Sequence, residues 1–202
     1  RPAPGMKQWV KVLIDNPGAA SLALFAREIL ANPRAMGAAC PSALALASGM
    51  AARVPLDREG LVVELGGGTG AVTAALLKHG VPPWRLVVVE RSPTLASHLR
   101  QRFSQLRVIQ GDAAQLNHLL GRPRPRLNSI VSSLPLRSLH PATTRAVAHQ
   151  LQTALDSSGL LVQYTYDLRG TQIRLLPGFR RLSSKIVWSN LPPARLEVFE
   201  RL

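Results

Sequence analysis

Cysteine, aromatic residues and acidic residues are all scarce in this chain of 202 residues. The single cysteine, Cys40, excludes an internal disulfide, and we interpret it as a free, buried thiol in a protein of a reducing compartment. Aromatic residues make up only 4% of the chain, so Leu, Val and Ala must fill the interior. We find no apolar run of membrane-spanning length and recognise no signal peptide, which favours a cytoplasmic protein.

The shortage of acidic residues leaves a large excess of positive charge. Eleven Asp and Glu face 25 Lys and Arg, and the formal net charge is +14. Such an excess predicts a polyanionic partner, either nucleic acid or the anionic surface of a membrane. The charge alone does not distinguish the two.

The stretch 61–70, LVVELGGGTG, is the feature around which the rest of the chain is organised. Apolar residues around one carboxylate predict a short buried strand, and glycines that follow allow a sharp turn close to a ligand. A dinucleotide fingerprint would use Gly66, Gly68 and Ala71. The methyltransferase form of the loop instead needs an acid before Gly-x-Gly-x-Gly, which Glu64 and Gly66 to Gly70 supply.

Two further acids follow the next predicted strands and decide between these alternatives. Strand 85–90 ends in Glu90, where a carboxylate can accept both ribose hydroxyls, and strand 107–110 runs into Gly111-Asp112-Ala113, where an acid suits an adenine amine. From Leu61 to Tyr166 the chain resembles class I S-adenosylmethionine-dependent methyltransferases. The resemblance implies S-adenosylmethionine as cofactor, S-adenosylhomocysteine as product, and a set of cofactor-binding residues: Glu64, Gly66, Gly67, Gly68, Thr69, Gly70, Glu90, Arg91, Asp112, Ala113, Ser132 and Leu134.

Alternating strand and helix patterns predict the fold class. Strands are expected at 61–65, 85–90, 107–110, 128–133 and 160–166, helices at 71–79, 93–103, 114–120 and 141–155, and a closing hairpin at 181–188 and 194–202. This is an α/β, doubly wound, mostly parallel, seven-stranded, Rossmann-like sheet with ligands at the carboxyl ends of its strands. We divide the chain into a helical extension, 1–42, and a methyltransferase domain, 43–202, whose first helix, 43–53, is capped by Ser42.

The N-terminal extension combines an apolar helical stripe with cations. Lys7, Trp9 and Lys11 beside that stripe are typical of a helix lying on a membrane surface, although a stripe packed on the domain explains the same pattern. Small residues at 37–42 would let this segment cover the cofactor pocket.

The fourth strand runs into Ser132-Ser133-Leu134-Pro135-Leu136, where methyltransferases of this fold present their acceptor nitrogen. Base N-methyltransferases place a stacking aromatic at the position of Leu136, so its absence argues against nucleic acid. Several motifs together resemble the bacterial phospholipid N-methyltransferases: Asn32-Pro33, Pro41-Ser42, the Glu64–Gly70 loop, Val89-Glu90-Arg91, Gly111-Asp112-Ala113, Ser133–Leu136 and Gln163-Tyr-Thr-Tyr166. This resemblance implies methylation of phosphatidylethanolamine toward phosphatidylcholine by a peripheral enzyme on the inner face of the cell membrane.

Methyl transfer requires a neutral amine aligned with the sulfonium methyl. Tyr164 and Tyr166 point to one side of a strand and are candidates to orient that nitrogen, although half-buried sheet tyrosines explain the same pattern equally well. His140 is a candidate proton acceptor, although a lone histidine in a loop is more often only solvated. Arg137 and Arg180 are candidates for the lipid phosphate. The histidines show no metal spacing, and a monomer is the default. The alternatives are an RNA adenine N6-methyltransferase of the rRNA dimethyladenosine type, and a binding protein without catalysis.

Overall fold

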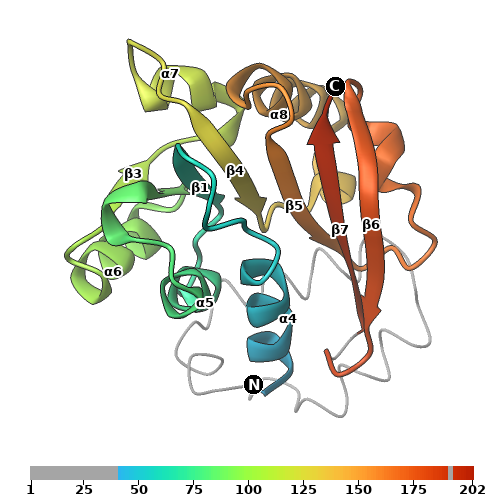
Figure 1. Ribbon diagram of the computed structural model, residues 1–202, viewed down its shortest axis with the longest axis horizontal. Coiled ribbons are helices and arrows are strands. Elements are labelled where there is room, and N and C mark those ends of the chain that lie inside the picture. Colours follow the sequence, from blue (N-terminus) through green and yellow to red (C-terminus); the bar gives the residue numbers. More distant parts are fainter. Residues whose placement is uncertain (1–40, 191–192) are drawn as a thin grey trace, which may run out of the picture.

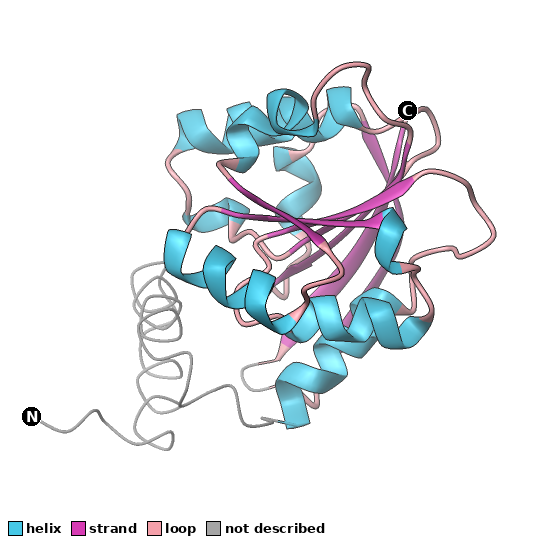
Figure 2. Ribbon diagram, turned by 90° about the vertical axis from the view of Figure 1, so that its left-hand side faces the viewer, coloured by secondary structure: helices cyan, strands magenta, loops and turns pink. Residues whose placement is uncertain are grey.

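The computed structural model describes residues 41–190 and 193–202, and this part of the chain forms a seven-stranded sheet with helices on both faces (Figures 1 and 2). The strands are β1 (Leu61–Leu65), β2 (Leu86–Glu90), β3 (Arg107–Gln110), β4 (Leu127–Ser132), β5 (Leu160–Thr165), β6 (Phe179–Val187) and β7 (Ala194–Arg201). The α-helices are α4 (Pro41–Ala51), α5 (Ala71–His79), α6 (Pro93–Arg102), α7 (Leu116–Leu120) and α8 (Pro141–Ala154). Short 3-10 turns are η1 (Pro83–Arg85), η2 (Ala113–Gln115), η3 (Leu136–Ser138) and η4 (Thr171–Leu175).

The strand order is β3-β2-β1-β4-β5-β7-β6. β1 to β5 pair in parallel, whereas β7 runs antiparallel between β5 and β6 (Figure 1). The chain moves outward from β1 to β3 and then returns to β4 on the other side of β1. The carboxyl ends of β1 and β4 therefore flank the point where the order reverses, which is where open α/β sheets bind ligands.

Two apolar layers hold the helices to the sheet. On one face α7 and α8 pack on side chains such as Leu65 and Ile130, and on the other α4, α5 and α6 pack on Val62, Val88 and Val131. Because both faces are covered, β2 and β4 are buried along their whole length. Burying each large apolar side chain contributes about 1.5–3 kcal/mol, so this arrangement fixes the strand ends that carry the site.

The α/β fold and every predicted strand within the described residues are confirmed, with ends displaced by one or two residues. The helix expected at 43–53 is α4, Pro41–Ala51, so Ser42 lies within the helix and not before it. The division into an extension, 1–42, and a domain, 43–202, stays a prediction. Arg85, the expected first residue of the second strand, is the last residue of η1, and β2 begins at Leu86. Its guanidinium donates to the carbonyls of Gly60, Leu56 and Arg58.

The predictions for the N-terminal extension stay predictions. Lys7, Trp9, Lys11 and Cys40 lie outside the described residues. Within 41–190 and 193–202, no helix is long and apolar enough to cross a bilayer.

Candidate active site

The glycines of the loop between β1 and α5 have different structural roles. Gly66, Gly68 and Gly70 have φ values of 77°, 54° and 86°, in the left-handed region that other residues rarely adopt. A Cβ on Gly67 would lie 2.5 Å from Val88 Cγ1, so this glycine allows the loop to pack on the sheet. A Cβ on Gly68 would meet only the Gly66 carbonyl oxygen, at 3.9 Å. The outer side of Gly68 is therefore open to a ligand.

Glu64, the last residue but one of β1, is a fully buried carboxylate two residues before the first glycine of this loop. Its Oε2 accepts a hydrogen bond from Thr73 Oγ1 on α5 at 2.7 Å, and its Oε1 has no partner. Burial raises the pKa of Glu64 to about 8, the Thr73 hydrogen bond opposes this, and the charge of Glu90 adds to it. A buried carboxyl oxygen without a partner is suited to a cationic or donor group of a ligand.

Glu90, at the end of β2, holds the glycine loop in place. Its Oε2 accepts from the Gly68 N–H at 2.9 Å, and its Oε1 accepts from the Ser92 N–H at 2.8 Å. Each carboxylate oxygen can accept a second hydrogen bond, so the side chain can bind a diol while it fixes Gly68. The carboxylate thus connects the second strand to the loop after the first.

Asp112, after β3, has one oxygen engaged locally. Its Oδ1 accepts from the Ala114 N–H at 2.9 Å and caps η2, while its Oδ2 lies 3.8 Å from Arg91 Nε. The Asp112 side chain is 38% exposed and the Arg91 side chain 80%. One oxygen of Asp112 therefore remains accessible at the same sheet edge as Glu64 and Glu90.

The segment after β4 lies against the glycine loop. A Cβ on Gly66 would lie 3.3 Å from Leu134 Cδ2, and the Ser133 N–H donates to the Leu65 carbonyl at 2.9 Å. Ser132, buried, accepts from the Leu134 N–H at 3.3 Å through its Oγ. The structure thus brings together the predicted residues of β1, β2, β3 and β4 at one sheet edge.

Comparison with known proteins agrees with this geometry. Residues 62–159 match the methyltransferase domain family. Ornithine lipid N-methyltransferase of Singulisphaera acidiphila is 29% identical over 179 residues, which cover 85% of this chain and 91% of that protein. A probable ribosomal RNA small subunit methyltransferase A of Methanococcoides burtonii is 29% identical over 131 residues, 63% of this chain and 44% of that protein. The chain spans less than half the length of this second relative.

Solved structures share the fold. TrmN from Thermus thermophilus superposes with a TM-score of 0.65 at 18% identity, covering 78% of this chain and 48% of that one. N-methyltransferase NodS from Bradyrhizobium japonicum, in complex with S-adenosylhomocysteine, gives 0.60 at 18% identity, covering 76% and 85%.

This chain contains a methyltransferase domain. Its cofactor is S-adenosylmethionine, as the sequence predicts. The open Gly68 and the unpartnered Oε1 of Glu64 fit such a ligand.

The two tyrosines of the methyltransferase domain contact each other. The ring centroids of Tyr164 and Tyr166 are 5.7 Å apart at an interplanar angle of 81°, an edge-to-face pair, and both pack against the same apolar cluster. The two side chains therefore lie on one side of the sheet, although Tyr166 follows the last residue of β5. Burial raises the pKa of both phenols, and in Tyr166 a hydrogen bond with Asn190 opposes the rise. Both therefore stay protonated at neutral pH and are donors or acceptors of hydrogen bonds, not bases.

His140 lies at the start of α8, where its Nδ1 accepts from the Ala142 N–H at 3.3 Å. A neutral imidazole that accepts at Nδ1 carries its proton on Nε2, so this ring has no free acceptor. The geometry favours the role of helix cap over that of proton acceptor.

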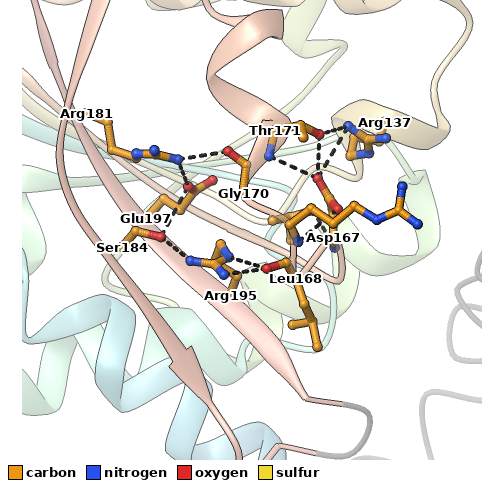
Figure 3. A network of polar contacts seen from close by, with 11 residues as sticks. Arg137, Asp167, Leu168, Gly170, Thr171, Arg181, Ser184, Arg195 and Glu197 are labelled. Atoms are coloured by element: carbon orange, nitrogen blue, oxygen red, sulfur yellow. Dashed lines mark hydrogen bonds and ion pairs between the residues drawn. The ribbon is translucent and has the colours of Figure 1, made fainter.

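The two candidate arginines lie at opposite ends of the parallel strands, Arg137 at the carboxyl end of β4 and Arg180 level with the amino end of β5. Arg137 follows β4 and donates to Thr171 Oγ1 at 2.6 Å beside Asp167 (Figure 3). Arg180 pairs across the sheet with Glu200, the register neighbour of Leu160 at the start of β5. Arg180 therefore lies near the amino ends of the parallel strands, whereas the glycine loop follows the carboxyl end of β1. This position argues against the lipid-phosphate role that we expected for Arg180.

Sequence reasoning gave no role to Thr73 and Gln163. Thr73 binds Glu64, and Gln163 donates from its Nε2 to the Leu134 carbonyl at 2.8 Å. A polar residue in the first turn of α5 and a glutamine after three apolar residues of β5 were the available signals.

Proposed function

We propose that this methyltransferase N-methylates the amine of a membrane lipid head group, with phosphatidylethanolamine and its mono- and dimethylated forms as the substrates. The observation that carries the proposal is the similarity to ornithine lipid N-methyltransferase along 85% of this chain and 91% of that protein. Ornithine lipid and phosphatidylethanolamine both present a primary amine at a bilayer surface. The likeness to the ribosomal RNA methyltransferases is confined to part of their length.

The segment after β4 supports a lipid over an RNA base. Leu136, at the position where base N-methyltransferases carry a stacking aromatic, is 2% exposed and belongs to the core under α8. Neither its chemistry nor its position suits base stacking. A flexible alkylamine needs no stacking surface.

We assign the cofactor-binding roles by strand. Glu64 and the glycine loop would hold the methionine part, Glu90 the ribose and Asp112 the adenine. The bound cofactor supplies an electrophilic methyl group on sulfur. The protein's own contribution is to align the acceptor nitrogen and to keep water away from it.

The amine must lose its proton before it can attack. Burial near a low-dielectric surface disfavours the ammonium form, so a strong base is not required. Carbonyls of the segment 132–134 and the phenol oxygen of Tyr166, beyond the end of β5, are suited to accept from the amine N–H groups. Because the phenols are neutral, they orient the nitrogen and do not remove its proton.

The membrane is the other partner in this proposal. The net charge of +14 favours an anionic leaflet, and each cation near such a surface contributes about 1 kcal/mol. The stripe with Lys7, Trp9 and Lys11 would dock on the inner face of the cell membrane and bring the cofactor pocket to the lipid.

The test is methyl transfer from labelled S-adenosylmethionine to four acceptors assayed side by side: vesicles with phosphatidylethanolamine, vesicles with ornithine lipid, vesicles of phosphatidylcholine and phosphatidylglycerol alone, and ribosomal RNA. We expect label in phosphatidylethanolamine and none in the control vesicles. Label in ornithine lipid alone would keep the lipid class and replace the head group. Label in RNA alone would overturn the proposal.

A further inference from the structure

Gln163 is a polar side chain in the middle of the sheet. It lies on β5 and is fully buried. Its register neighbours are Ser132 on β4 and Glu197 on β7, so the three side chains form a polar row on the face covered by α8. A buried polar row in an otherwise apolar sheet needs a reason, because each unsatisfied member costs about 1–3 kcal/mol.

The contacts of Gln163 point toward the acceptor segment. Its Nε2 donates to the Leu134 carbonyl at 2.8 Å and to the Tyr164 carbonyl at 3.2 Å, while its Oε1 is buried and has no partner. The amide thus reaches out of β5 to a carbonyl of the neighbouring loop, and the bond spans 29 residues of sequence.

Leu134 is the residue through which this contact reaches the cofactor loop. Its Cδ2 lies 3.3 Å from where a Cβ on Gly66 would be. Leu134 therefore sits between the glycine loop and Gln163. A displacement of the Leu134 backbone would therefore shift both the segment after β4, which presents the acceptor, and its contact with the glycine loop.

A second set of polar contacts, nearer the protein surface, joins the segments that follow β4 and β5. Arg137 donates to Thr171 and lies 3.4 Å from Asp167, in the segment after β5, and Arg181 links the Gly170 carbonyl to Glu197 (Figure 3). Arg137, in this second set, is 47% exposed, so water competes for its contacts. The hydrogen bond from Gln163 to Leu134 joins the same two segments and comes from a fully buried side chain.

We propose that Gln163 is a positioning residue for methyl transfer: its amide fixes the Leu134 carbonyl and thereby the segment that presents the acceptor amine to the methyl group. This rests on the proposed transfer to an amine, but not on the amine being a lipid. Gln163 acts through Leu134 and contacts neither reactant.

The experiment compares Gln163→Leu and Gln163→Met with Thr144→Val as a matched control. Thr144 is also buried, and its Oγ1 donates to the Leu136 carbonyl at 2.9 Å, two residues beyond Leu134 in the same segment. The readouts are kcat and KM for the acceptor, Kd for S-adenosylmethionine by calorimetry, and Tm.

Both Gln163 variants should lower kcat on the order of 10- to 100-fold, because a misplacement of about 1 Å has such an effect. The Kd of both variants for S-adenosylmethionine should stay within about threefold of the wild-type value. Thr144→Val should lower Tm by about as much as the Gln163 variants do, while its kcat stays within about threefold of wild type. Unchanged kcat in either folded Gln163 variant overturns the inference. So does an equal fall of kcat in Thr144→Val, which would indicate general loosening.

The two proposals fail separately. A wild-type enzyme that labels only RNA refutes the lipid proposal, and the Gln163 variants are then measured with RNA as the acceptor.

Discussion

Replacing Glu64 by glutamine should stabilise the ligand-free protein, and only at the higher pH values. The carboxyl is fully buried, with Thr73 as its hydrogen-bond donor and one oxygen unpartnered. Glutamine has nearly the same shape and can still accept from Thr73. It removes only the ability to carry a negative charge in this position.

The size and sign of the effect follow from the pKa of Glu64. In the folded protein burial raises it from its ordinary 4.5 to about 8. A raised pKa means that the folded state holds a proton that the unfolded state has released, so stability falls as pH rises from 4.5 to 8 and is constant above that. The full difference corresponds to at most about 5 kcal/mol. Below pH 4.5 the two proteins should differ little.

The assay is urea unfolding of wild type and Glu64→Gln at several pH values between 5 and 9, followed by tryptophan fluorescence. The difference in the free energy of unfolding should grow with pH in favour of the variant, since most other titrating groups are shared and cancel. The same variant should bind S-adenosylmethionine at least tenfold more weakly at pH 9, because it cannot offer a negative charge to the cofactor. A stability difference that does not change with pH would refute the reasoning.

Three further predictions concern the cofactor and the membrane. Glu90→Ala should weaken S-adenosylmethionine binding tenfold or more by calorimetry, since hydrogen bonds to a charged group contribute about 1.5–3 kcal/mol; an unaltered Kd would remove Glu90 from the ribose site. Gly67→Ala should lower Tm more than Gly68→Ala, because its Cβ would lie 2.5 Å from another side chain, whereas Gly68→Ala should lose more cofactor affinity; the reverse order would contradict the assignment of the two glycines. Reversing Lys7 and Lys11 to glutamate, or adding about 0.5 M salt, should reduce turnover on anionic vesicles and leave cofactor affinity intact; turnover that survives both would exclude docking through this segment.

The cofactor side of the site was predictable because its determinants are local. A buried strand, glycines and an acid at each following strand end are read from consecutive residues. The parallel order of the strands then brings Glu64, Glu90 and Asp112 to one edge. What local sequence does not contain is the bond between Glu90 and the Gly68 N–H, which joins residues 22 positions apart.

The acceptor side was less predictable because it depends on strand direction and register. Arg180 follows β5 in sequence, which suggested a place beside the pocket. The connection formed by residues 166–178 runs back to the amino ends of the parallel strands before β6 begins, and Arg180 lies at that end. Gln163 was recognised only as part of a motif, since its partner Leu134 belongs to another strand end.

The position of β7 has a consequence for how the protein is made. β5 carries Gln163 and leads to Tyr166, yet the strand that pairs with its outer edge, β7, is the last of the sheet in sequence and lies between β5 and β6. During synthesis β5 therefore leaves the ribosome well before its antiparallel neighbour, and its edge stays open until residues 194–201 follow. Such an edge is a template for pairing with other chains. A nascent chain stalled before Ala194 should accordingly bind no S-adenosylmethionine with native affinity and should depend on chaperones, although the entire glycine loop has already been translated.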